Sequence, residues 1–249
     1  LESGGKAGEW LFDPTNVTIG TTGDPSSGNN AGTSSITASS IAGLLEGGSS
    51  VTVTTGFTGE DLGDLTVASA ITKSSGDTDV TLTLSAANSI IIREAIENTG
   101  GSGALNLIFD ADNNLSSRDG AGIVILEANL STAGGDVTFG GTEVNGYTGG
   151  NLYVDGGTTA ITVTTGGGDV TVKGLLMVHN ESEQGFVVST AGGDIHLAGE
   201  VDSGDNFRLY AANDWDDALK HAKGMSNSSR VRWLATIDSP IENALAVRA

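Results

Sequence analysis

The sequence contains no cysteine, and this absence excludes disulfides, thiolate nucleophiles and zinc–thiolate sites together. Prolines number only three, and aromatic residues make up 5% of the 249 residues. Long apolar runs are also absent, since none approaches the roughly 18 residues that a membrane-spanning helix needs, so we expect no membrane insertion. Apolar residues nevertheless reach 37%, which indicates a packed protein rather than a disordered or collagen-like chain.

Basic residues are also scarce: 11 Lys and Arg stand against 31 Asp and Glu, for a formal net charge of -20. The imbalance is confined to residues 1–205, which hold 26 acidic and 5 basic residues. Such a surface repels phosphate backbones and anionic lipids, so nucleic acid is excluded as a partner. A large, acidic, threonine-rich chain without thiols suits an extracellular or cell-surface location.

Glycine is abundant, with 38 residues, and it punctuates a repeated phrase. The phrase is Thr-Ala-Gly-Gly-Asp-Val or a close variant, and it starts at Thr132, Thr165 and Thr190. Looser copies precede Val51 and Val80. In each copy a glycine turn leads into alternating apolar and threonine residues, the pattern of a strand with one buried face. The aspartates of successive copies are separated by intervals within the roughly 20 to 45 residues that are typical of one solenoid repeat.

Short strands are predicted between the copies as well, and no helix is expected among them. A parallel sheet can form without helices if the chain winds as a helix of strands. We therefore predict an all-β fold, a right-handed parallel β-helix over 1–205 with about eight to ten coils of roughly 20 to 25 residues. The additional strands are expected at 17–19, 65–67, 89–92, 104–109, 122–126, 152–154, 160–164, 175–179 and 186–188.

Residues 206–249 have a different pattern. A short strand is expected near Phe207, followed by an amphipathic helix over 213–224. A strand over 231–237 then leads to a capping box at Ser239-Pro240-Ile241-Glu242, which starts a second helix. We expect this small C-terminal α-helical segment to be an end cap or a partial module.

The segments Gly8–Ile19, Leu44–Thr55, Gly63–Thr72 and Leu82–Ile92 resemble filamentous haemagglutinin-like bacterial exoproteins of the two-partner-secretion type. The phrase Trp10-Leu-Phe-Asp-Pro-Thr-Asn-Val-Thr-Ile19 carries the resemblance most specifically, and coverage extends over about residues 8–200. The resemblance implies a secreted or surface-anchored β-helical protein used in adhesion, biofilm or matrix. It implies no catalytic residue.

A second resemblance covers about residues 207–249. The segments Trp215–Ala222 and Trp233–Ala244 are similar to the opening strand and two helices of a C-type-lectin-like domain. The half of that domain that carries the long loop and the calcium-binding carboxylates is absent from this sequence, so no sugar-binding residue is transferred. The segment is expected to be a partial lectin-like module or the end cap.

Hard oxygen donors are densest between Asp110 and Asp119, and calcium is the one cofactor that they suggest. The pattern departs from an EF-hand loop because the sixth position is Leu115 and the twelfth is Ala121. A solvated loop is the alternative, and the same two readings apply to the aspartates of the repeated phrase, Asp136, Asp169 and Asp194. The calcium candidates are Asp110, Asp112, Asn114 and Asp119.

Catalytic patterns are weak. His179, His196 and His221 lack the spacing of a metal site or a catalytic triad. The carboxylate pairs Asp202/Asp205 and Glu181/Glu183 could serve in glycoside hydrolysis on a β-helix. Few basic residues are present to neutralise an acidic glycan, so we expect no enzyme, and a polysaccharide-acting enzyme is kept as an alternative.

The function expected from these observations is adhesion or spacing by a stiff extracellular rod. Its partners would be a glycan or protein of a host cell or matrix. An alternative is a matrix filament in which identical chains stack end to end, because the last coil of a β-helix leaves backbone groups unpaired.

Overall fold

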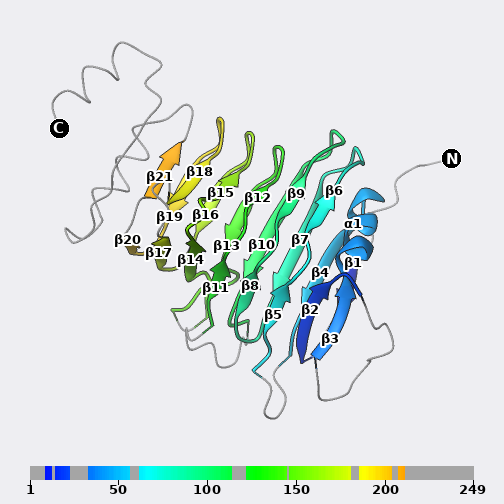
Figure 1. Cartoon of the computed structure of the whole chain (residues 1–249), viewed down its shortest axis with the longest axis horizontal. Coiled ribbons are helices and arrows are strands. Elements are labelled where there is room, and N and C mark those ends of the chain that lie inside the picture. The colour runs from blue at the N-terminus through cyan, green and yellow to red at the C-terminus, as the bar shows by residue number, and fades with distance from the viewer. Residues whose placement is uncertain are drawn as a thin grey trace.

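The computed structural model describes residues 9–12, 15–22, 33–56, 62–113, 122–144, 146–180, 185–203 and 207–210. Within these ranges every pairing between named strands is parallel, and the strands form three sheets that run along one long axis (Figure 1). The predicted all-β parallel β-helix is therefore confirmed.

The three sheets contain seven, eight and six strands, and we call them sheets A, B and C. Sheet A comprises, in spatial order, β1 (Glu9–Phe12), β4 (Ser50–Thr54), β7 (Val80–Ser85), β10 (Leu105–Asp110), β13 (Val137–Phe139), β16 (Val170–Val172) and β19 (Ile195–Leu197). Sheet B comprises β3 (Thr33–Thr37), β2 (Asn16–Gly20), β5 (Leu65–Val67), β8 (Ile90–Ile92), β11 (Val124–Leu126), β14 (Leu152–Gly157), β17 (Leu176–Asn180) and β20 (Val201–Ser203). Sheet C comprises β6 (Ile71–Lys73), β9 (Ile96–Asn98), β12 (Leu130–Ser131), β15 (Ile161–Thr164), β18 (Phe186–Ser189) and β21 (Phe207–Tyr210).

From β5 onward each coil contributes one strand to sheet B, then one to sheet C, then one to sheet A. In the coil before, the helix α1 (Ala38–Glu46) stands between β3 and β4 and contacts β6, the edge strand of sheet C. The expectation that this stretch lacks helices was wrong. Its apolar residues Ala38, Ile41 and Leu45 share one buried face, and the Thr37 hydroxyl caps the first turn by accepting the Ser40 N–H at 3.1 Å.

Several coils are longer than predicted. Leu82 pairs with Leu107, and Leu152 pairs with Leu176; the separation of these paired residues along the chain is within the coil length expected. The register that joins Val137 to Val170 spans a longer coil, and the extra residues lie in its corners because the strands themselves stay short. A coil adds one strand to each sheet, so the number of strands in a sheet indicates the number of coils. The seven, eight and six strands observed are at or below the lower end of the eight to ten coils expected.

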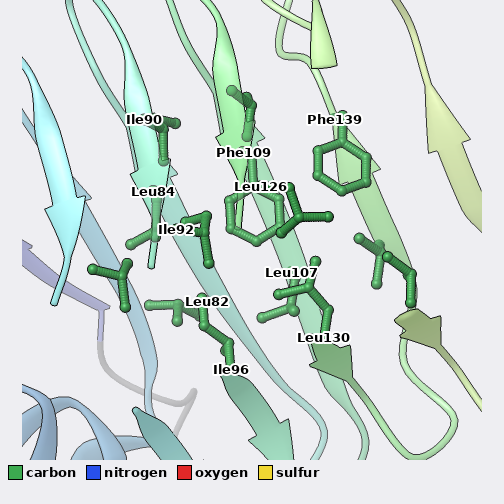
Figure 2. Packing of buried hydrophobic residues seen from close by; sticks show 14 of the residues in the cluster. Leu82, Leu84, Ile90, Ile92, Ile96, Leu107, Phe109, Leu126, Leu130 and Phe139 are labelled. Carbon is green, nitrogen blue, oxygen red and sulfur yellow. The ribbon is translucent and has the colours of Figure 1, made fainter. Parts of the chain in front are cut away.

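Strand alternation builds the core. In β7, Val80, Leu82 and Leu84 are buried, whereas the intervening hydroxyl residues are partly exposed. Buried aliphatic side chains of all three sheets point toward one another, and Phe109 stacks on Phe139 with ring centroids 5.2 Å apart (Figure 2). The core therefore runs from coil to coil without interruption through the part of the chain that the structure describes.

The two glycines of the repeated phrase have different roles. Gly134 has φ of 104°, a conformation that a residue with a Cβ rarely adopts. The second, Gly168 in the next copy, has no room for a side chain, since a Cβ would lie 2.2 Å from the Gly135 carbonyl oxygen. One glycine thus turns the corner, and the other lets neighbouring coils approach.

Strand β21 pairs with β18, so the solenoid extends at least to Tyr210, whereas the expected boundary is at residue 205. The helices and strand predicted over 213–249 lie outside the described residues. In the described ranges no helix has the length and hydropathy required to cross a bilayer.

Candidate functional site

Of the four calcium candidates, Asp110 and Asp112 lie within the described residues, and Asn114 and Asp119 do not. Asp110 ends β10, and its carboxylate lies over Gly141 of the next coil, where a Cβ would be 2.2 Å away. Asp112 is 4% exposed with φ of 53°, and its N–H donates to the Asn88 carbonyl at 2.8 Å. The calcium site stays a prediction, because half of its residues are not described.

The neighbouring Asn113 fastens this corner to the preceding coils. Its Nδ2 donates to the Ser85 hydroxyl at 2.9 Å and to the Thr54 hydroxyl at 3.2 Å. The first half of the predicted calcium loop is therefore held in place by contacts with sheet A.

The aspartates of the repeated phrase form an outer row on sheet A. The Oδ1 atom of Asp136 accepts the Asp169 N–H, and that of Asp169 accepts the Asp194 N–H, both at 2.8 Å. One coil earlier, Asn106 takes the place of an aspartate, since its Oδ1 accepts the Asp136 N–H at 2.9 Å. One oxygen of each of these side chains thus links successive coils. Among the described residues, no group of three or more carboxylates and histidines is arranged to hold a metal ion.

A second row, inside the solenoid, was missed from the sequence. We call it the inward polar column; it lies at the corner between sheets C and A. Each member follows or ends a strand of sheet C at a position that alternation directs inward. The column comprises Lys73, Asn98, Thr132, Thr165 and Thr190, which are all at most 5% exposed.

The three threonines of the column make the same contacts. Each hydroxyl donates to the carbonyl three residues later, at Gly135, Gly168 or Gly193. The hydroxyl oxygens of Thr132 and Thr165 also lie 3.4 and 3.3 Å from the carbonyl oxygen of the next threonine, so their single proton is shared between two acceptors. These hydroxyls close the turn of their own coil and connect it to the following coil.

Lys73 and Asn98 take the same positions in the first two coils of the column. The Lys73 ammonium donates to the carbonyls of Gly76 at 3.2 Å and Gly103 at 3.0 Å. Asn98 Nδ2 also donates to Gly103, at 3.0 Å, while its Oδ1 atom is buried without a hydrogen-bond partner. The strand Ile71–Lys73 contained the signal for this column, because Ile71 and Lys73 are two residues apart and therefore share a face.

Carboxylates close to Lys73 stabilise the same corner from outside. The Ser74 hydroxyl and N–H donate to Glu46 at 2.6 and 2.8 Å, and these bonds lower the pKa of Glu46. The Ser102 N–H and hydroxyl likewise lower the pKa of Asp77. The Lys73 charge lowers both pKa values further.

Residues that could act as catalysts are not brought together in the described ranges. Asp202 lies on β20, whereas Asp205, Glu181, Glu183 and His221 are outside the described residues. His179 lies on sheet B and His196 on sheet A. His196 Nε2 is 3.9 Å from the Asp194 carboxylate. The absence of catalysis remains an expectation.

The outer face of sheet B carries an aromatic contact. The rings of Tyr153 and His179 stack with centroids 6.3 Å apart and an angle of 15°. Desolvation, and then the nearby carboxylate of Asp155, raise the pKa of Tyr153. This contact belongs to the side of the protein that faces solvent.

No protein-family model matches the chain, and neither does any curated protein.

Proposed function

We propose that the chain is a non-enzymatic segment of an extracellular β-solenoid that acts in surface adhesion or as a stiff spacer. The observation that carries this proposal is the continuous core, in which all three sheets keep parallel register from coil to coil. Because each coil is joined to the next by backbone ladders and by side chains such as those of the inward polar column, bending requires many contacts to change together.

The exterior suits such a role. Outward positions on sheet A are largely threonine, serine and asparagine, and the net charge of -20 keeps rods apart and soluble. The corners between strands vary in length, and they are the segments in which contacts can be added without disturbing the core. The filamentous haemagglutinin-like resemblance favours a secreted protein with this task.

Adhesion is tested with beads that carry the purified chain, offered to immobilised glycans and matrix proteins. We expect retention of the beads under flow. The control is a bead that carries the Leu107→Asp variant, which places a charge in the core and unfolds the rod. Equal retention of both beads would refute adhesion by the folded rod, and release of reducing ends from a glycan would indicate an enzyme.

End-to-end assembly is a second candidate, favoured by the strands at the sheet edges. Sheets A and B begin at β1 and β3, and the described sheets end at β19, β20 and β21. Edge strands present backbone groups to which a further strand can add. Sedimentation and electron microscopy over a range of concentrations test this, since filaments should form and should shorten when Ser35→Lys places a charge on β3.

A further inference from the structure

One row of outward side chains on sheet B changes character along the solenoid. Parallel register aligns the outward residues of successive strands, starting with Ser35, Thr18 and Thr66. The next four are apolar, and we call them the apolar stripe: Ile91, Ile125, Tyr153 and Met177. All four are partly exposed, whereas the residues on either side of them in their strands are buried.

Further apolar residues widen the stripe. Ile123 and Leu175 come two residues before Ile125 and Met177 in the chain, so they point to the same side, and both are partly exposed. The stripe crosses three spacings between strands, a length of about 14 Å. It is therefore elongated along the axis of the solenoid.

The solenoid itself does not require this composition. The corresponding row of sheet A contains Leu11, Thr52, Thr83, Ile108, Thr138, Thr171 and His196. Threonine thus occupies four of these seven positions, and no two apolar residues are neighbours in this row. A contiguous apolar row outside the core is the type of surface that marks an interaction site.

Carboxylates line one flank and one end of the stripe. Glu127 and Asp155 come two residues after Ile125 and Tyr153, on one flank. At the end of the stripe, Glu200 precedes β20, the next strand of sheet B, and Asp202 on β20 follows Met177 in register. The Arg93 guanidinium lies 3.6 Å from the Glu127 carboxylate. A second copy of this chain, with its own charge of -20, would meet like charge here, whereas a cationic partner would meet opposite charge.

We propose that the apolar stripe binds an amphipathic helix of another protein, with aliphatic side chains on one face and lysine or arginine on the flank that meets Glu127 and Asp155. A helix rises about 1.5 Å per residue, so roughly nine residues, or two to three turns, cover the stripe. The helix would lie along the solenoid axis, with its apolar face on the stripe and its cations near the carboxylates. This inference rests on the proposed adhesive function, for which it names a face and a class of partner.

Fluorescence anisotropy tests the proposal with a labelled leucine–lysine peptide that forms an amphipathic helix. The comparison peptide has the same composition in scrambled order. The stripe variant is Ile91→Thr with Ile125→Thr, which gives both positions the residue found at Thr18 and Thr66. The matched control is Ile108→Thr on sheet A.

We expect the helical peptide to bind wild type and the Ile108→Thr control equally, and the stripe variant about tenfold more weakly. Circular dichroism of all three proteins establishes that each is folded. Equal binding of the scrambled peptide, or equal weakening by the two variants, would mean attraction by net charge alone and would overturn the proposal. Binding of a neutral glycan that is lost in Tyr153→Ala, without peptide binding, would overturn it in favour of a sugar site.

The bead assay separates this inference from the proposed function. Retained beads without peptide binding would overturn the helix site and leave adhesion standing. Peptide binding that follows the stripe, with no bead retention, would support the helix site and refute adhesion.

Discussion

Replacement of Thr165 by valine tests whether the hydroxyls of the inward polar column stabilise the fold. The test is whether the free energy of unfolding falls or rises. The side chain is fully buried, and its hydroxyl donates to the Gly168 carbonyl and lies 3.3 Å from that of Thr190. Valine has nearly the same shape, so the change replaces a hydroxyl by a methyl group and tests the hydrogen bond rather than the volume of the side chain. If the interior required only apolar atoms, this variant would be more stable than wild type.

The magnitude follows from two opposing contributions. Burying the added methyl group in place of the hydroxyl favours the variant by about 0.8 kcal/mol. Loss of the hydroxyl leaves the buried Gly168 carbonyl without this donor, which costs about 1–3 kcal/mol. We therefore expect the free energy of unfolding to fall by roughly 0.2–2 kcal/mol.

Urea denaturation followed by circular dichroism measures the total change, and hydrogen exchange of peptides that cover 163–172 locates it. The matched control is Thr171→Val on the outer face of β16, for which we expect a change within about 0.5 kcal/mol. Faster exchange should be confined to the corner between sheets C and A. A Thr165→Val protein that is as stable as wild type, or more stable, would refute the role assigned to the column.

The remaining predictions concern the turns, the core and the pH dependence. Gly168→Ala should lower the free energy of unfolding by about 1–3 kcal/mol, because its Cβ would lie 2.2 Å from the Gly135 carbonyl oxygen. The control, Gly43→Ala in α1, has nothing within 4 Å of its Cβ and should raise the free energy of unfolding by about 0.5–1 kcal/mol. Equal effects of the two variants in urea melts would contradict the close approach of the coils. Phe139→Ala should cost about 3–5 kcal/mol, because the ring is fully buried and stacked on Phe109; a loss below about 1 kcal/mol would show that the coils repack. The lowered pKa of Glu46 means that its carboxylate contributes stability above its ordinary pKa of 4.5 and that this contribution is lost as the pH falls through the lower folded value. The difference in Tm between wild type and Glu46→Gln should therefore narrow below about pH 4.5, and a difference that stays constant to about pH 3 would contradict the assignment.

Local periodicity was sufficient to predict the fold class. In Val80–Ser85 and Leu105–Asp110 alternation alone identifies which side chains are buried, and the structure confirms both strands. Coil length was harder to predict, because insertions in corners lengthen a coil without altering its strands. The helix α1 was missed since its nine residues include a glycine and only three buried positions, too short a pattern to stand out among glycine and serine.

The inward polar column was missed for a different reason. Threonine was expected to face outward, yet Thr165 comes one residue after the outward Thr164, so alternation places it inside. Two adjacent threonines therefore have opposite environments. The carbonyl groups of a tight turn in the same coil make the inward one favourable. The acceptor lies only three residues further along the repeated phrase, but the sequence does not show that the backbone there turns its carbonyl toward the hydroxyl.

The location of function on this protein follows from which positions the fold leaves free. Inward positions must be apolar or must pair with turn carbonyls, as Leu107 and Thr165 do. Turn positions are restricted by backbone conformation and close approach, as at Gly134 and Gly168. The outer faces carry neither of these two constraints, so neither of them requires a departure from threonine there. The change from Thr66 to Ile91 on sheet B is such a departure, and because it continues over successive strands, we expect selection for a partner rather than for the fold to maintain it.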